Sequence, residues 1–398
     1  MKKKYILISI FLFSIAGKAQ INDLLQLSSS QLQFHAVDSF TQVSFQDCSF
    51  GDEPGTPQMP YWVVRYVIPF DQKVDKVVIN SFSSQTLNGR YRIYPIQPPQ
   101  AISEPSPAFV LPNLAIYNSP TPYPNVKVEV ASHVYDKGYH IVTLYVYPLA
   151  YTPTIGQLRL YTSIAFTLQL TANNNQGIRP RFQSENMQQI IQNQICSMVR
   201  NPDAVLGETP SNVEPQFLHG ATPQSTYFFN TMPEYIIITN NNDIDGNPIP
   251  LYNGKKMTDV FGELADWKTK KGIPTVVVTV DEIKVRYQGN DLQEQIRNYL
   301  KDIYENYSGC TYVLFGGDIN IIPARFISTR GYRFPSDMYY TSTYGTWDAD
   351  QDGVYGEGVD DLHYSTDFYY GRASVKNVIE AKTFVNKVIG YELSLIHI

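Results

Sequence analysis

Acidic residues gather in one short stretch of the sequence, WDADQDGVYGEGVDD, which spans residues 347–361. The acids of this stretch that could bind a cation are Asp348, Asp350, Asp352 and Glu357, with Asp360 and Asp361 as acids that could complete the shell. Alternating carboxylates around a sharp turn at Gly353 suit a Ca2+ ion, which takes about six to eight oxygen ligands. The stretch departs from an EF-hand loop, because Val359 stands where that loop places its final glutamate. It therefore predicts a calcium site, with an acidic solvated turn as the alternative.

Two further aspartates stand at the ends of expected strands. Asp318 directly follows the apolar segment 311–317, and Asp367 opens the apolar segment 367–372. These segments are expected to be neighbouring strands, so the two carboxylates could form a second oxygen cluster at the base of the long loop between them. The alternative is that each aspartate caps a turn or the end of a helix. The residues themselves leave both interpretations open.

The sequence contains three cysteines, Cys48, Cys196 and Cys310. An odd number of distant cysteines cannot close a disulfide framework, and no CxxC or HxxxH spacing indicates zinc. A catalytic thiolate needs a nearby base and a position at the end of a strand, whereas Cys310 precedes its strand. The histidines of the C-terminal half are His363, in the acidic stretch, and His397. We therefore expect none of the three cysteines to be a nucleophile.

The C-terminal half alternates short apolar strands with amphipathic helices. The expected strands are residues 235–239, 275–280, 311–317 and 367–372. The expected helices are residues 251–271, closed by Gly272, residues 292–307, and a segment capped by Ser374. Strands of β-branched residues without polar alternation indicate a parallel sheet covered on both faces. Ligand sites in such sheets lie beyond the carboxyl ends of the strands, which is where Asp318 falls.

Residues 20–171 are expected to form an all-β domain. Six segments show partial two-residue alternation between turn-rich stretches: 61–70, 73–82, 90–96, 126–135, 140–151 and 158–170. Such spacing is typical of a β-sandwich, with residues 95–109 as a connecting loop. Residues 172–233 are polar and turn-rich around one short helical segment, so we expect an exposed linker there. Its candidate processing points are Arg179, Arg181 and Arg200.

Residues 1–19 combine a basic start, an apolar core and a small-residue end, in the order MKKKYILISIFLFSIAGKA. This pattern is typical of a secretory signal, here cleaved between Ala19 and Gln20. The alternative, a transmembrane anchor, requires about 20 apolar residues, and this run is shorter. The composition, 43% hydrophobic and 17% charged, indicates folded domains, and a net charge of −6 gives no support to nucleic-acid binding. The sequence predicts a secreted or outer-surface protein with no transmembrane anchor.

Four segments of the C-terminal half, 264–283, 296–325, 336–357 and 367–392, together resemble the gingipain-type cysteine peptidases. Residues 20–171 resemble the N-terminal prodomain of the same secreted proenzymes, through the segment GTPQMPYWVVRYVIP. The resemblance implies a multidomain chain: a β-sandwich-like prodomain, then a caspase-like α/β catalytic domain over residues 234–392, incomplete in this sequence. It also implies bound Ca2+, and the calcium ligands that it implies are Asp318, Asp361 and Asp367.

In that family the catalytic histidine and cysteine lie downstream of the helix that ends near Glu392. Residues 393–398, LSLIHI, do not continue the family pattern and are interpreted as non-native read-through, so His397 is given no catalytic role. The resemblance therefore implies the front part of a calcium-stabilised cysteine endopeptidase precursor. This part is itself inactive, while the complete enzyme takes protein or peptide substrates and its own prodomain is the intramolecular inhibitor.

Two other functions are compatible with parts of this pattern. A catalytically dead family member could act as a cell-surface adhesin or scaffold, and only the downstream cysteine and histidine would distinguish it from an active peptidase. A carbohydrate-binding β-sandwich on a calcium module is the third option. The extent of the resemblance in the α/β half disfavours it.

Overall fold

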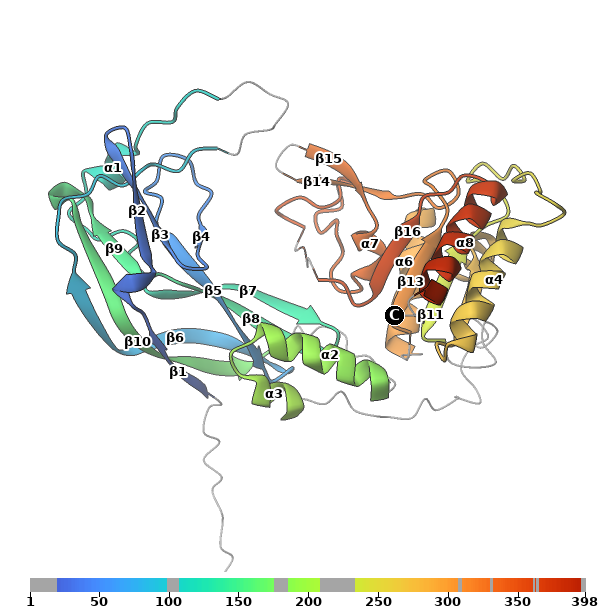
Figure 1. Ribbon diagram of the computed structural model, residues 1–398, viewed down its shortest axis with the longest axis horizontal. Coiled ribbons are helices and arrows are strands. Elements are labelled where there is room, and N and C mark those ends of the chain that lie inside the picture. The colour runs from blue at the N-terminus through green and yellow to red at the C-terminus, as the bar shows by residue number, and fades with distance from the viewer. Residues whose placement is uncertain are drawn as a thin grey trace, which may run out of the picture. The chain divides into compact units, whose positions relative to one another are not determined.

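The computed structural model describes residues 20–98, 107–174, 185–207, 233–306, 310–329, 332–360, 362 and 365–394. Its chain divides into two compact units. The first comprises Met1–Val64, Asp71–Ala131 and Thr143–Asn174, and the second comprises Arg65–Phe70, Ser132–Val142 and Asn175–Ile398. The first unit is built mainly from strands, whereas the second combines strands and helices (Figure 1). This division confirms the expected change from a β-rich to an α/β half.

The first unit contains long strands in two sheets. One sheet has the order β1 (Gln20–Gln26), β10 (Gln157–Ala172) and β6 (Gln72–Thr86), with β9 (Leu149–Thr152) also paired to β10. The other has the order β4 (Ser49–Phe50), β5 (Pro60–Ile68), β8 (Tyr139–Val146) and β7 (Val128–Asp136). The remaining elements are the hairpin of β2 (Leu32–Val37) and β3 (Phe40–Phe45), the 3-10 turns η1 (Ser29–Gln31) and η2 (Pro153–Ile155), and α1 (Leu114–Tyr117). The ends of β5, β7 and β8 that carry residues 65–70 and 132–142 belong to the second unit.

Strand β10 shows why this half forms β-structure. Its side chains Ile164, Phe166 and Leu168 recur at every second position, and each is 0% exposed. Because alternate residues of a strand share one face, this period places them in one core. The prediction of a strand over residues 90–96 is wrong. These residues form only isolated bridges, of Ile93 with Thr41 and of Pro95 with Pro57. Pro95 has no N–H to donate to a ladder.

The sheet of the second unit is parallel. Its order is β12 (Thr275–Thr279), β11 (Tyr235–Thr239), β13 (Tyr312–Gly316) and β16 (Tyr369–Ala373). Ile236, Ile237 and Ile238 of β11 are each 0% exposed, although successive side chains of a strand point to opposite faces. Both faces of the sheet are therefore covered, which confirms the prediction made from its unbroken apolar strands.

Helices cover this sheet, and a hairpin extends from it. The helices are α4 (Met257–Lys270), α5 (Val280–Arg286), α6 (Leu292–Asn306), α7 (Met338–Thr341) and α8 (Val378–Ser394), and the hairpin joins β14 (Arg325–Thr329) and β15 (Tyr332–Ser336). Helices α4 and α8 pack against each other (Figure 1). Gly272 ends α4 with a φ of +88°, as expected. Helix α8 begins later than predicted, because Asn377 rather than Ser374 accepts from an N-terminal amide, that of Glu380, at 2.9 Å.

Part of the segment expected to be a linker is folded. Within residues 172–233, α2 (Glu185–Met198) and α3 (Pro202–Gly207) are helices. Met187, Ile191 and Ile195 of α2 are almost fully buried in a cluster that also contains Val67. This burial corrects the expectation of an exposed linker for residues 185–207. Arg200 is exposed, whereas Arg179 and Arg181 lie outside the described residues.

Candidate functional site

The acidic stretch forms a loop in which three predicted ligands converge. One carboxylate oxygen each from Asp348, Asp350 and Asp352 lie within 4.8 Å of one another. Gln351 and Gly353, with φ of +62° and +81°, turn the backbone so that these side chains point to one centre. Three hard oxygen donors around one point suit Ca2+, whose ligands are carboxylate and carbonyl oxygens.

Glu357 shares the electrostatic environment of this cluster. Partial desolvation, followed by the charges of Asp352, Asp350 and Asp360, raises the pKa of the Glu357 carboxyl. Its side chain is thus close enough to the aspartates to be repelled by them. A bound divalent cation would relieve that repulsion, which makes Glu357 a reasonable fourth ligand. Asp361, the remaining predicted ligand of this stretch, lies outside the described residues.

Asp360 shapes the loop instead of facing its centre. It is 0% exposed, and its carboxylate accepts hydrogen bonds from the amides of Ala349, Gly356 and Glu357 at 2.8–2.9 Å. Trp347, also fully buried, anchors the start of the loop through its carbonyl, which accepts from Gly356. The buried pair closes the loop at both ends, a role that the sequence pattern does not distinguish from metal binding.

Asp318 and Asp367 do not form the expected second oxygen cluster. Strands β13 and β16 are neighbours, as predicted, but they are parallel, with Tyr312 opposite Tyr369. Asp318 follows β13 and Asp367 precedes β16. The two residues therefore lie at opposite ends of these neighbouring strands. The length of the strands separates them, about 13 Å at roughly 3.3 Å per residue. A single ion therefore cannot bind both.

Each of these two aspartates accepts hydrogen bonds of its own. The carboxylate of Asp318 accepts from the amide of Asn320 at 2.9 Å and so caps the turn after the strand. Asp367 accepts from the amide and the hydroxyl of Thr343, at 2.9 and 2.6 Å. Burial raises the pKa of Asp367 to about 6, although the hydrogen bonds from Thr343 act in the opposite direction. The contact of Asp318 matches the alternative interpretation, in which the aspartate caps a turn. Asp367 instead accepts from Thr343, 24 residues earlier in the chain, so it caps neither a turn nor a helix there.

Buried arginines organise the loops around the carboxyl edge of the sheet. Arg297 of α6 is 7% exposed and donates to the carbonyls of Ser342, Tyr344 and Gly345. Arg325 makes a bidentate pair with Asp291, at 2.7 Å for both bonds. Arg372 of β16 pairs with Asp337 in the same manner. The sequence predicts no role for these side chains; its one signal, an arginine at the end of an apolar segment, applies to Arg325 and Arg372.

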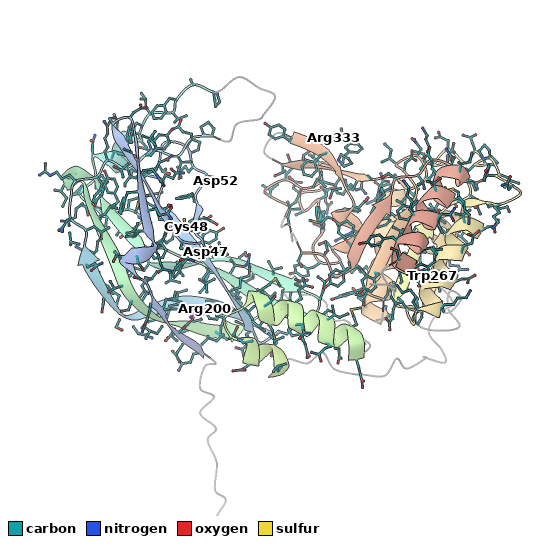
Figure 2. The ribbon with its side chains drawn as sticks, viewed as in Figure 1. Asp47, Cys48, Asp52, Arg200, Trp267 and Arg333 are labelled. Atoms are coloured by element: carbon teal, nitrogen blue, oxygen red, sulfur yellow. The ribbon has the colours of Figure 1, made fainter. Side chains whose placement is uncertain are left out.

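The three cysteines occupy structural positions. Burial raises the pKa of the Cys310 thiol, and Cys310 lies before β13, at the amino edge of the sheet. Cys48 lies beside Asp47 in the first unit (Figure 2), where its sulfur accepts from the amide of Phe45 at 3.4 Å. Cys196 lies on α2, and its thiol faces the carbonyl of Pro202 at 3.8 Å. A thiol that burial keeps protonated is a poor nucleophile.

The turn of the hairpin between β7 and β8 is part of the second unit. Lys137, at the turn between β7 and β8, is 5% exposed. Its ammonium group donates to Asp136 at 2.8 Å and to the carbonyl of Thr366 at 3.1 Å. The same group lies 4.8 Å from the centre of the Tyr369 ring. Residues 132–142 are therefore bonded to the segment that enters β16.

Known proteins match both parts of the chain. Residues 20–197 match the family model Propeptide_C25, and residues 230–396 match the model of peptidase family C25. Gingipain R2 of Porphyromonas gingivalis is 28% identical over 142 residues, which cover 35% of this chain and 16% of that protein. Gingipain R1 of the same organism is also 28% identical over 142 residues, 12% of its length. The chain thus spans a small part of the length of these relatives.

Two solved structures are also similar. The complex of Porphyromonas gingivalis RgpB pro- and mature domains covers 48% of this chain and 94% of that chain, with 18% identity and a TM-score of 0.39. A structure of gingipain K described for its zymogenic latency covers 40% of this chain and 90% of that chain, with 20% identity and a TM-score of 0.35. Among the described residues, no helix combines the length and the apolar character that crossing a membrane requires.

Proposed function

Because the chain belongs to peptidase family C25 and carries the propeptide of that family, we propose that it is the front part of a secreted cysteine endopeptidase precursor. The observation that carries the proposal is the order of the two matches on one chain: propeptide over residues 20–197, then peptidase over residues 230–396. A propeptide directly before a peptidase domain is the arrangement of a zymogen. Gingipain R2 is more than twice as long as this chain, since the same 142 residues are 35% of this chain and 16% of that protein, which leaves room for catalytic groups outside these residues.

The proposed reaction is hydrolysis of a peptide bond. A cysteine thiolate attacks the carbonyl carbon, a histidine transfers its proton to the leaving amine, and water then releases the acyl group from sulfur. Backbone amides stabilise the oxyanion. The three cysteines of this chain do not suit that role, because Cys310 is buried and protonated and the other two lie outside the sheet. The nucleophile and base are proposed to lie in the rest of the parent protein.

The propeptide is proposed to keep the enzyme latent. The support is the contact of Lys137 with Thr366 and Tyr369, which fixes a propeptide hairpin to the entry of β16. Removal of the propeptide would break the contact between Lys137 and the segment that enters β16. Residues 1–19 are proposed to direct export, since they have the pattern of a secretory signal.

Calcium is proposed to stabilise the peptidase domain. Asp348, Asp350 and Asp352, with Glu357, would hold the ion through carboxylate oxygens. The cation would neutralise the repulsion among these acids and rigidify the loop that Asp360 and Trp347 close. Its proposed role is structural, because the proposed reaction is carried out by a thiolate and a histidine.

The test compares the full-length parent with residues 1–398 in hydrolysis of a fluorogenic peptide library. The expected result is turnover by the parent after propeptide removal, abolished by iodoacetamide, and no turnover by residues 1–398. A processed, folded parent without turnover would favour the adhesin or scaffold alternative. Turnover by residues 1–398 alone would contradict the assignment of the catalytic groups.

A further inference from the structure

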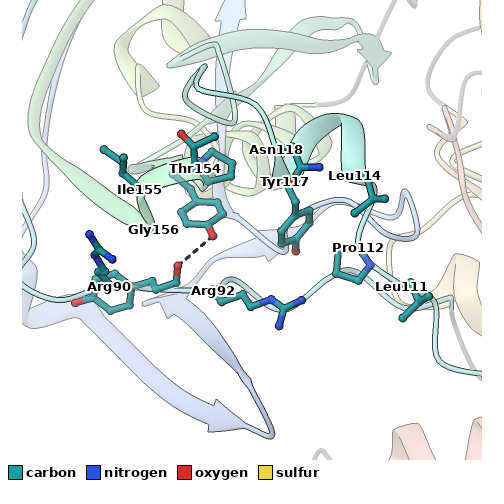
Figure 3. Close-up of a pocket in the computed structure, with 13 residues that line it drawn as sticks. Arg90, Arg92, Leu111, Pro112, Leu114, Tyr117, Asn118, Thr154, Ile155 and Gly156 are labelled. Carbon is teal, nitrogen blue, oxygen red and sulfur yellow. Dashed lines mark hydrogen bonds between the residues drawn. The ribbon is translucent and has the colours of Figure 1, made fainter.

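A cavity of about 640 Å³ opens in the first unit, between the extended segment 90–92, helix α1 and the turn η2 (Figure 3). This volume lies in the range of ligand sites in proteins, about 300–1,000 Å³. Neither family match assigns a ligand to this unit. The chemistry of the cavity therefore has to be deduced from its lining.

Two hydrogen-bonded tyrosines support the cavity. Tyr151 is 1% exposed, and its hydroxyl donates to the carbonyl of Tyr91 at 3.1 Å, the bond drawn in Figure 3. The hydroxyl of Tyr117 donates to the carbonyl of Ile93 at 2.7 Å, and the two rings lie 6.4 Å apart. Because both hydroxyls are engaged with the backbone, the rings are fixed and the cavity is present before any ligand binds.

Positive charge lines the mouth of the cavity. Arg90 and Arg92 are both exposed, and alternate positions of an extended segment put their side chains on one side. The Arg92 guanidinium lies 4.4 Å from the centre of the Phe40 ring, which holds it in place. Neither arginine forms an ion pair with a carboxylate of the residues that the structure describes. The two guanidinium groups are therefore available to an external anion.

Aliphatic side chains and one amide complete the rim. Leu111, Leu114 and Ile155 are 75%, 69% and 52% exposed, high values for aliphatic residues around one cavity. In Figure 3, Arg90 and Ile155 lie on one side, Leu111 and Leu114 on the other, and Arg92 between them. The side-chain amide of Asn118 also lines the cavity and makes no hydrogen bond within the described part of the chain.

We propose that this cavity binds an extended peptide segment that carries a carboxylate next to aliphatic side chains. A guanidinium group binds a carboxylate with two parallel hydrogen bonds, and the charge of the pocket is complementary to such a group. The aliphatic side chains of the rim contact the apolar side chains that flank the carboxylate in the bound peptide. The Asn118 amide can donate a hydrogen bond to a peptide group and accept one from it. An acyl chain has no such donors or acceptors, so the lining favours a peptide over a lipid.

The test uses the full chain and two fluorescein-labelled peptides that differ in one residue. The first has a Leu-Glu-Leu centre between Gly-Ser flanks, and the second has Leu-Gln-Leu. Fluorescence anisotropy is expected to show at least tenfold tighter binding of the glutamate peptide. The double variant Arg90→Gln/Arg92→Gln is expected to lose this preference, and Leu114→Ser to weaken both peptides. Arg159→Gln, an exposed arginine on β10, is the matched control and should bind as the unchanged chain does.

Equal binding of the two peptides would overturn the proposal, and so would a glutamate preference that survives the double arginine variant. Vesicles of phosphatidylcholine with oleate serve as the lipid arm. Binding to these vesicles that depends on Arg90 and Arg92, without binding of the glutamate peptide, would assign the cavity to a lipid and also overturn the proposal. Because all four substituted side chains are exposed, loss of folding is not expected, and circular dichroism checks it.

Discussion

The guanidinium group of Arg372 and the carboxylate of Asp337 form a bidentate pair, at 2.7 Å from Nε and 2.6 Å from Nη2. The same guanidinium donates from Nη1 to the carbonyls of Gly317 and Ile322, at 2.9 and 2.8 Å. Arg372 therefore connects β16 to the Gly-Gly-Asp turn after β13 and to the start of α7. One side chain fixes three segments at the carboxyl edge of the sheet.

Replacing Arg372 with Gln should destabilise the second unit strongly. The side chains of Arg372 and Asp337 are 12% and 14% exposed, so the substitution leaves a buried carboxylate without its partner. Such a loss costs about 3–5 kcal/mol in the free energy of unfolding. Urea unfolding followed by fluorescence measures it. Arg333→Gln, on the exposed strand β15 (Figure 2), is the control and should change stability by less than about 0.5 kcal/mol. Equal effects of the two substitutions would contradict this role of Arg372.

Gly316 should not tolerate alanine. A Cβ at this position would lie 2.7 Å from the ring of Phe261, which is 0% exposed on α4. Overpacking of this kind costs about 1–3 kcal/mol. Thermal unfolding should show the loss for Gly316→Ala and a partial recovery when Phe261→Leu is added. Gly262→Ala is the comparison. Gly262 lies on α4, as Phe261 does, and a Cβ there would have no atom within 4 Å. Additive effects of Gly316→Ala and Phe261→Leu would show that the two positions do not clash.

Calcium should raise the melting temperature of the second unit. At a free concentration one hundred times the dissociation constant, a bound ion adds about 2.7 kcal/mol to the free energy of unfolding. Chelation with EDTA should reverse the effect, and the triple variant Asp348→Asn/Asp350→Asn/Asp352→Asn should abolish it. Asp266→Asn, exposed on α4, is the control for lost charge. A calcium effect that persists in the triple variant would place the ion elsewhere.

Asp367 should make stability fall as the pH rises from about 4 to 6. Burial raises its pKa from the ordinary value of 3.8 to about 6, so the folded state holds a proton that the unfolded state has released. The stabilising contribution is complete below the unfolded pKa and is lost as the pH rises through the folded pKa, a change of about 3 kcal/mol at roughly 1.4 kcal/mol per unit.

Asp367→Asn keeps a carbonyl oxygen for Thr343 and removes the charge, so it should flatten this part of the pH profile. Thermal unfolding from pH 4 to 7 in the presence of EDTA compares the variant with the unchanged chain. Asp266→Asn should leave the profile as it is. The same slope in the chain with Asp367→Asn would assign the pH dependence to other groups.

Cys310 should react more slowly with iodoacetamide than Cys48 or Cys196. Burial raises its pKa and removes it from solvent, whereas the other two thiols are half-buried. Mass spectrometry of the alkylated chain at pH 8 measures the three rates. Cys310→Ala in the full-length parent should retain turnover of peptide substrates. Loss of turnover in a folded Cys310→Ala protein would make Cys310 a candidate nucleophile after all.

The sequence allowed much of the α/β sheet to be predicted, because Ile236 to Ile238 form an unbroken apolar strand and Gly272 marks the end of its helix. The convergence of Asp348, Asp350 and Asp352 also followed from their spacing. The separation of Asp318 from Asp367 was not predicted from the sequence. In neighbouring parallel strands, the end of one strand lies far from the start of the other. Long-range partners were likewise out of reach: nothing local to Arg372 indicates Asp337, 35 residues away.

The identity of the nucleophile is the most direct test of the account. The processed full-length parent would be labelled with a biotinylated peptidyl chloromethyl ketone, and the modified residue located by mass spectrometry. We expect one cysteine to be labelled, outside residues 1–398, with loss of turnover in proportion to labelling. Modification of Cys48, Cys196 or Cys310, or turnover that survives complete labelling of cysteines, would contradict the proposal that this chain is the front part of a cysteine endopeptidase precursor.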